Sequence, residues 1–360
     1  MNQTTLPQQP ARVLKHSRPS LWLSLATCLS LATQVRADDP QIDAALKLAT
    51  TFLLSQTMPK GDFGQKFPTA MTSLSILALA ACGHQPTEPT PEGQAMRKGL
   101  DFILLPQNQT EEGYFGKGDS SRMYGHGITT LMLAEMVGMA ADDQQDARIR
   151  EKLKLAIDLI LRAQNVPKKP SSSGGWHYQP DMPTADMSIS CWQVMALRAA
   201  QNAGLEVPHQ AIDNAVTFIK SKYQQAPDRK GRDQKDVGGF GYSTRGFGIS
   251  TTAEGLLAMQ VCGRYDDYQT IAASNHLLTG DVKTPPHLFY TQYYYAQAMY
   301  QRGGKYAEAS KRIVPQVLLP KQHADGSFQG QDEGGGKVYT ASMAILALAV
   351  KNHFLPIYQR

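Results

Sequence analysis

Cysteine is scarce in this 360-residue sequence, and its distribution excludes a disulfide framework. The four cysteines, Cys28, Cys82, Cys191 and Cys262, are widely spaced along the chain. The first lies in an N-terminal segment that we expect to be removed, which leaves an odd number. A chain of this length can bury a core large enough to be stable without covalent crosslinks.

The sequence also has little excess charge of either sign once its N-terminal segment is set aside. The whole chain holds 36 Lys and Arg against 31 Asp and Glu. Four of the basic residues and none of the acidic ones lie in residues 1–37, so 32 basic residues face 31 acidic ones in the remainder. This balance gives no reason to expect a nucleic acid as a partner.

Long hydrophobic runs are missing except for residues 21–33, and that run is shorter than the roughly 20 residues that cross a bilayer. Basic residues precede it, and Val35-Arg36-Ala37 follows it as a small-x-small pattern. We predict a signal peptide at residues 1–37 and export to the periplasm, the cell envelope or the medium. No membrane-spanning segment is expected after its removal. A retained N-terminal anchor is the alternative.

An internal repeat occupies the rest of the chain. Each of six units has an amphipathic segment, a turn that commonly contains Gly-x-aromatic, and a second, Ala-rich segment, and the apolar spacing near 3.6 residues predicts two helices per unit. The charged insert at residues 226–236 is predicted to be a loop. The second segments cover residues 69–83, 125–138, 185–197, 248–263, 289–304 and 338–350.

Six helix pairs can stack as an open solenoid or close into an α6/α6 toroid, with one ring of helices inside another. An open solenoid needs polar caps at both ends. The last unit is instead as apolar as the others, with SMAILALAV followed by FLPIY. We therefore predict an all-α fold in which residues 38–360 form a single α/α-toroid domain.

The turns carry a resemblance to a known superfamily. The spacing Gln-x-x-x-Gly-x-Phe occurs at residues 109–115 and 322–328, and its Gly-x-aromatic end recurs at 61–63, 174–176 and 238–240. This resembles the Gln-Trp repeat of terpenoid cyclases and protein prenyltransferases, and the chain looks most like exported bacterial proteins described as squalene-cyclase-like. The resemblance covers nearly all of the sequence beyond residue 37 and implies a toroid with a central cavity.

The catalytic residues of those enzymes are not present in this sequence. Where squalene-type cyclases have Asp-x-Asp-Asp, the best match here reads Asp186-Met187-Ser188-Ile189, and the Asp-x-Cys zinc element of prenyltransferases does not occur. We expect no metal and no cofactor. A lone aspartate at a helix start is expected to cap the helix, with its pKa lowered by the N–H groups, so that it cannot act as a strong acid.

The candidate ligand-contacting residues lie at the starts of the second helices, which we expect to meet at one mouth of the cavity, where their dipoles favour an acidic or polar ligand group. The candidates at and near this mouth are Tyr124, His126, Asp186, Ser188, Tyr290 and Tyr339, then Trp192, Glu254 and Tyr294 one turn deeper, and Trp176, His177, Tyr178 and Arg245 in loops.

Two functions remain open from the sequence. The first is binding of a small molecule, such as a lipid, or of a peptide or glycan in the cavity. The second is an enzyme, either a divergent terpenoid cyclase or transferase or a polysaccharide lyase or hydrolase, that uses Asp186 with His126 or Glu254. Glycosidases commonly need two carboxyl groups, which Asp186 and Glu254 could supply. The sequence identifies no protein partner.

Overall fold

The computed structural model describes residues 39–227, 233–242, 246–330, 334–352 and 354–359. The predicted signal peptide and Arg245 lie outside these residues. Everything below concerns the compact unit Gln41–Arg360. In the described part of the chain, no helix is both long and apolar enough to cross a membrane.

The described residues are mostly helical, as predicted, and two series of helices alternate along the chain. The first series is α2 (Pro40–Ser55), α4 (Pro91–Ile103), α6 (Asp143–Asn165), α8 (His209–Ser221), α10 (Tyr268–Thr279) and α12 (Gly304–Leu318). The second series is α3 (Pro68–Ala81), α5 (Arg122–Met136), α7 (Met187–Asn202), α9 (Ile249–Val261), α11 (Leu288–Arg302) and α13 (Gly336–Leu348). Short 3-10 turns are η1 (Pro106–Asn108), η2 (Pro170–Ser172), η3 (Leu319–Lys321), η4 (Ala349–Asn352) and η5 (Pro356–Tyr358).

The charged insert predicted as a loop is in part a β-hairpin. Strands β1 (Tyr223–Pro227) and β2 (Asp233–Phe240) pair antiparallel, with Tyr223 opposite Phe240, and β2 packs on α9 and α10. The prediction was wrong here because the insert's charge and its Pro and Gly suggested a loop, whereas tertiary contacts support strand pairing.

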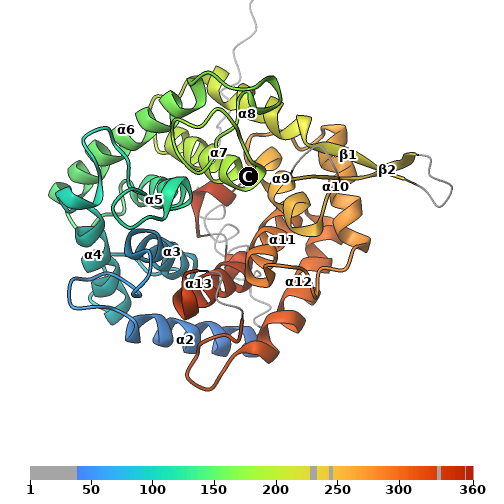
Figure 1. Ribbon diagram of the computed structural model, residues 1–360. Helices are drawn as coiled ribbons and strands as arrows, with labels where there is room; N and C mark the ends of the chain where they lie inside the picture. Colours follow the sequence, from blue (N-terminus) through green and yellow to red (C-terminus); the bar gives the residue numbers. More distant parts are fainter. Residues whose placement is uncertain (1–38, 228–232, 243–245, 331–333, 353, 360) are drawn as a thin grey trace, which may run out of the picture. The chain divides into compact units, whose positions relative to one another are not determined.

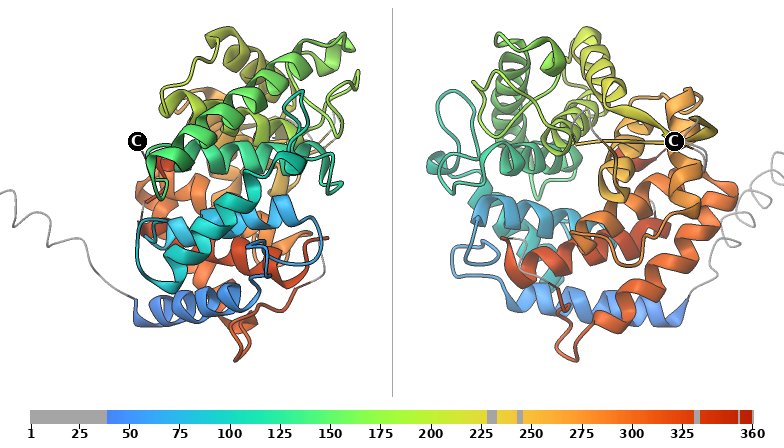
Figure 2. Two further views of the ribbon diagram at one scale, coloured as in Figure 1. Left: turned by 90° about the vertical axis from the view of Figure 1, so that its left-hand side faces the viewer. Right: turned by 45° about the vertical axis from the view of Figure 1, so that its right-hand side comes forward.

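The second-series helices, which we call the inner helices, contact one another in a cycle. Each packs against the next, from α3 to α5, α7, α9, α11 and α13, and α13 packs against α3 (Figure 1, Figure 2). Their sequences explain why they are buried. Helix α3 is apolar or small on all sides and is buried at every position from 69 to 81, whereas α4 buries one face only.

The glutamines of the repeat connect consecutive first-series helices. The Gln109 side-chain amide donates to the Lys152 carbonyl of α6 (2.9 Å), and Gln164 donates to the Ala211 carbonyl of α8 (2.9 Å). Gln322 of the last unit donates to the Ala45 carbonyl of α2 in the first unit (2.8 Å). The same bond that joins neighbouring units therefore joins the last unit to the first.

The glycines of the repeat allow the turns to lie close to the backbone of these first-series helices. A Cβ on Gly113 would lie 2.2 Å from the Leu155 carbonyl oxygen, and one on Gly326 would lie 2.2 Å from that of Leu48. Both glycines also have positive φ, at +98° and +87°. No other residue type meets both conditions without displacing the backbone.

The turn aromatics are fixed by bonds from their backbone to the inner helices. The N–H of Phe63 donates to the Thr72 hydroxyl (2.9 Å), that of Trp176 to Ser190 (2.9 Å), and that of Phe240 to Thr252 (3.2 Å). In the second unit the Phe115 N–H donates to Nδ1 of His126 instead (3.3 Å). By this bond His126 corresponds to Ser190 of the third unit.

The end of the chain packs inside the cycle, against the C-terminal ends of α3 and α5 and against α11. In this C-terminal segment (residues 349–352 and 354–358), the Ile357 N–H donates to the Glu135 carboxyl of α5 (3.2 Å). Asn352 donates to the carbonyl of Ala81 at the end of α3 (3.3 Å), and the Tyr358 hydroxyl pairs with that of Tyr293. The segment therefore covers this end of the inner helices (Figure 1).

Candidate functional site

Asp186 caps helix α7, as predicted. Its Oδ1 accepts the N–H of Ile189 (2.8 Å), and its own N–H donates to the Trp176 carbonyl (2.9 Å). The residue has extended backbone geometry and is only 2% exposed. The cap satisfies one of the free N–H groups at the helix start and places the second carboxyl oxygen toward the neighbouring loops.

The second oxygen of Asp186 faces two loop residues. The Tyr242 hydroxyl donates to Oδ2 (3.2 Å), and Nε2 of His177 lies 3.9 Å from it. Burial nevertheless raises the pKa of Asp186, and the Ile189 N–H, the His177 ring and the Tyr242 hydroxyl offset this only in part. The expected lowering of this pKa was wrong, because the loss of water around a buried carboxylate outweighs its hydrogen bonds.

Glu254 supplies a second carboxyl group from the neighbouring inner helix, α9. The side chain is 1% exposed and forms a hydrogen bond with Ser188 of α7. Burial raises its pKa to about 8, and the nearby charge of Asp186 adds to the rise. Its Oε2 has no hydrogen-bond partner among the described residues. At neutral pH the Glu254 carboxyl therefore keeps its proton.

Tyrosines from two further inner helices complete this site. Tyr124 of α5 bonds Ser188, and burial raises its pKa, with the charges of Asp186 and Glu254 contributing. Burial raises the pKa of Tyr290 in α11, and the charge of Glu254 makes the next largest contribution to this rise. We call Tyr124, Asp186, Ser188, Tyr242, Glu254 and Tyr290 the polar cluster. Tyr242 is 48% exposed, so the cluster has a solvent-facing side.

Several of the other candidates border the polar cluster. The His177 and Tyr178 rings pack edge to face at 4.7 Å, and the Tyr178 ring lies 5.9 Å from that of Tyr124. Tyr339 of α13 is half-buried and contributes to the raised pKa of Tyr290. These aromatic rings surround the exposed edge of the cluster.

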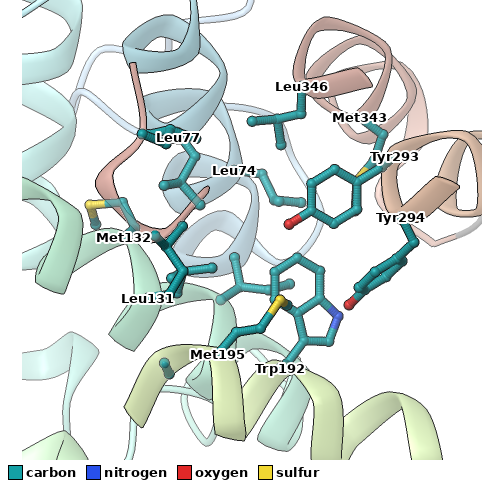
Figure 3. Packing of buried hydrophobic residues seen from close by; sticks show 14 of the residues in the cluster. Leu74, Leu77, Leu131, Met132, Trp192, Met195, Tyr293, Tyr294, Met343 and Leu346 are labelled. Atoms are coloured by element: carbon teal, nitrogen blue, oxygen red, sulfur yellow. The ribbon is translucent and has the colours of Figure 1, made fainter. Parts of the chain in front are cut away.

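Aromatic side chains fill the space one turn deeper, where the sequence predicted a cavity wall. The Trp192 ring stacks on that of Tyr293 (5.8 Å, 7° between planes) and meets that of Tyr294 edge to face (5.8 Å). Figure 3 shows these rings among Leu74, Met195, Met343 and other apolar side chains from the surrounding inner helices. All of these side chains are buried.

Two hollows found in the described residues lie elsewhere. One, of about 130 Å³, lies between η2 and α8 and is lined in part by Pro170, Asn214 and Phe218. The other, of about 10 Å³, lies beside the C-terminal segment and is lined in part by Gln297 and Leu346. Neither touches the polar cluster.

The structure does not bring His126 to the polar cluster. Its Nε2 lies 3.2 Å from the Ala156 carbonyl oxygen of α6, and Nδ1 accepts the Phe115 N–H. Burial lowers its pKa to about 3, so the ring is neutral and holds the turn against α6. Trp176 has a similar role, because its indole N–H donates to the Ile160 carbonyl (2.8 Å).

Tyr242 is the member of the cluster that our sequence reasoning missed. The signal was present, because Trp176-x-Tyr178 and Phe240-x-Tyr242 place a tyrosine two residues after the aromatic in consecutive units. Within the described residues, His, Cys, Asp and Glu side chains form no group of three that could hold a metal ion.

Comparisons with known proteins give a structural likeness only. No family model matches the sequence, and no curated protein matches it. The chain resembles a terpene cyclase in structure. The apo structure of type II terpene cyclase MstE from Scytonema has 13% sequence identity and a TM-score of 0.35, covering 86% of this chain and 97% of the enzyme. A variant of that enzyme, solved with geranylgeranyl dihydroxybenzoate, has 12% identity and a TM-score of 0.39, covering 88% and 99%.

Proposed function

We propose that this chain is an exported α6/α6 toroid of the terpenoid-cyclase-like superfamily that binds a ligand at the polar cluster. The cyclic contacts of the inner helices, and the bond from Gln322 to Ala45, support the toroid. The Gln-x-x-x-Gly-x-Phe repeat supports the superfamily. The basic, apolar N-terminal segment supports export.

The observation that carries the ligand-binding proposal is the gathering of polar groups from several inner helices at one half-exposed place. A buried polar atom left without a partner costs about 1–3 kcal/mol. The Oε2 of Glu254 is in this state among the described residues, and the Tyr290 hydroxyl has only the neighbouring Tyr294 hydroxyl beside it. A bound molecule that satisfies these groups would recover that cost, which is the usual reason for retaining such groups at a binding site.

Native mass spectrometry of the purified protein tests the proposal. We expect a bound small molecule on the wild-type chain and a lower occupancy on the Glu254→Gln variant. Glu135→Gln is the matched control, since Glu135 is equally buried but lies against the C-terminal segment. A wild-type protein without any ligand, isolated from its own source under gentle conditions, would count against the proposal.

A second candidate function is acid–base catalysis by Asp186 and Glu254. The favouring observation is that Glu254 keeps its proton up to a pH of about 8 beside a second carboxyl group. A protonated carboxyl next to an ionisable one can serve as a general acid. His126 is excluded from this role by its position, so Glu254 is the partner that the geometry favours.

The two functions are separated by following the mass of the captured ligand during incubation with fresh protein. Catalysis by Glu254 predicts that wild-type protein changes the mass and that Glu254→Gln binds the ligand but leaves it unchanged. Conversion should also decline as the pH rises above about 8, where Glu254 loses its proton. Equal conversion by the two proteins would rule out Glu254 as the acid.

A further inference from the structure

A group of buried hydrogen-bond donors that are not fully satisfied lies just inside the polar cluster. The indole N–H of Trp192 and the hydroxyls of Tyr290 and Tyr294 are buried and have no partner outside this group of three among the described residues. Their rings are in contact, with 5.8 Å between the centroids of Trp192 and Tyr294 and 4.8 Å between those of Tyr290 and Tyr294. Figure 3 shows the Trp192 nitrogen and the Tyr294 hydroxyl on the facing sides of their rings.

The chemistry of these groups defines what they can bind. An indole N–H can only donate, and a bond between the Tyr290 and Tyr294 hydroxyls uses only one of their two hydrogens, so a complementary group must supply acceptor oxygens. The Glu254 carboxyl, which influences both tyrosines, also donates while it is protonated. A carbonyl or hydroxyl oxygen of a ligand would satisfy them.

The charges around the site select against an anion or a cation. Asp186 and Glu254 are the acidic groups that act on Tyr124, and the exposed Arg122 lies over the Tyr178 ring, 5.8 Å from its centre, at the outer edge of the cluster. An anionic group placed beside Trp192 and Tyr294 would therefore lie near two carboxyl groups, with Arg122 only at the outer edge of the cluster. An ammonium group has no acceptor to offer the Trp192 N–H, which would stay without a partner.

The surroundings of the donors are apolar. Leu74, Met195 and Met343 are buried beside Trp192 and Tyr294 (Figure 3). Methionine side chains are flexible and can repack around an inserted group. The rings of Tyr124, Tyr290 and Tyr339 are only half-buried, so entry from the polar cluster needs the movement of a few side chains.

We propose that the ligand of this protein is an uncharged, mainly apolar molecule whose hydroxyl or carbonyl oxygen accepts hydrogen bonds from Trp192, Tyr290 and Tyr294. The inference rests on the proposed ligand-binding function and adds the class of ligand. Neighbouring tyrosines provide the internal contrast. The Tyr294 hydroxyl has no partner beyond Tyr290, whereas the adjacent Tyr293 uses its hydroxyl to bind Tyr358 at the other end of the inner helices.

Four eight-carbon probes test the class of ligand, because they share a chain and differ in the terminal group: octan-1-ol, octanoate, octylammonium and octane. Isothermal titration calorimetry at pH 7 should show the tightest binding for octan-1-ol, by about tenfold over octane, the factor that corresponds to one hydrogen bond of about 1.4 kcal/mol. Preference for octanoate or octylammonium would overturn the inference and leave ligand binding at the cluster in place. Binding by none of the probes would overturn it also, and a co-purified ligand of different chemistry would then still support the proposed function.

Paired variants locate the binding. Tyr294→Phe should weaken octan-1-ol binding about tenfold and leave the unfolding midpoint unchanged or higher, because it removes an unsatisfied group. Tyr293→Phe should lower the midpoint and leave binding unchanged. Trp192→Phe and Trp176→Phe form a second pair, in which only the first should weaken binding, since the Trp176 N–H is already bonded to Ile160. Equal effects of Tyr294→Phe and Tyr293→Phe on binding would contradict the proposal.

Discussion

The two ends of the inner helices each hold one buried glutamate, and the glutamates differ in what they contact. Burial raises the pKa of both Glu254 and Glu135 to about 8. Glu135 accepts the Ile357 N–H of the C-terminal segment, whereas Glu254 has a carboxyl oxygen without a partner among the described residues. The chain thus offsets the cost of burial through Ile357 at one end, whereas at the other end Glu254 bonds Ser188 and keeps its Oε2 without a partner among the described residues. Under the proposed function, this difference in partners would distinguish a structural carboxyl group from a ligand-binding one, which burial and pKa do not.

The largest expected effect comes from removing the packing of the C-terminal segment. Ile357 is 4% exposed, so Ile357→Ala should lower the free energy of unfolding by about 3–4 kcal/mol, through lost burial and the cavity left behind. Phe354→Ala, in the same segment but at an exposed position, is the control and should cost much less. Urea denaturation measures both. Similar losses of unfolding free energy in the two variants would mean that the C-terminal segment does not pack tightly against this end of the inner helices.

The pH dependence of stability should come next in size. A glutamate with a folded pKa of about 8, above its ordinary value of 4.5, holds a proton that the unfolded chain releases, so it destabilises the fold as the pH rises from 4.5 to 8. Between pH 5 and pH 7, Glu135→Gln and Glu254→Gln should each recover roughly 2–3 kcal/mol of the stability that the wild type loses.

Denaturation at pH 5, 6, 7 and 8 provides this measurement for each variant. Only Glu254→Gln should also change ligand occupancy. A stability that varies equally with pH in the wild type and in both variants would show that neither glutamate is protonated in the folded state at pH 7.

A smaller change in stability distinguishes the two contributions of Asp186, its hydrogen bond to the start of α7 and its negative charge. Asp186→Ala removes the acceptor for the Ile189 N–H and should cost about 1 kcal/mol, whereas Asp186→Asn keeps an equally good cap and should cost less than about 0.5 kcal/mol. Thermal unfolding of both variants gives the comparison. A loss for Asp186→Asn as large as for Asp186→Ala would assign the main effect to the charge.

The smallest effect is expected at the exposed edge of the polar cluster. Tyr242→Phe removes one hydrogen bond of a half-exposed side chain and should change the free energy of unfolding by about 0.5 kcal/mol or less. Tyr358→Phe, at the other end, removes a buried hydroxyl pair and should cost about 1 kcal/mol. A larger loss of stability for Tyr242→Phe than for Tyr358→Phe would contradict the view that the C-terminal segment covers one end of the inner helices and the exposed polar cluster lies at the other.

Much of the helical architecture followed from the spacing of apolar residues, and the repeated turns followed from glycine. The turns at Gly113 and Gly326 could be predicted because both the positive φ and the adjacent carbonyl oxygen require glycine at these positions. The position of His126 could not be obtained in this way. Aligning α5 with α7 on their C-terminal ends pairs His126 with Ser188, whereas the bond from the Phe115 N–H pairs it with Ser190, two residues further along. The spacing of apolar residues does not indicate which end of a helix is held in place by hydrogen bonds to a neighbouring turn.

The C-terminal segment shows a second limit. Its apolar residues argued against a polar cap, but nothing in their spacing indicated that Ile357 would lie against Glu135, 222 residues earlier. The Tyr242 contact with Asp186 likewise joins two loops across 56 residues. Contacts of this kind depend on the assembled fold and have no local pattern from which to be predicted.

The bond from Gln322 to Ala45 has a consequence for how the chain acquires its structure. It joins residues 277 positions apart, and Gly326 can approach Leu48 only when the last unit is present. A growing or partly refolded chain therefore has two exposed helix edges until its final residues arrive. We expect the last step of folding to be the docking of these two edges, so that a chain truncated within the sixth unit would be more prone to aggregation than one altered at any single internal turn.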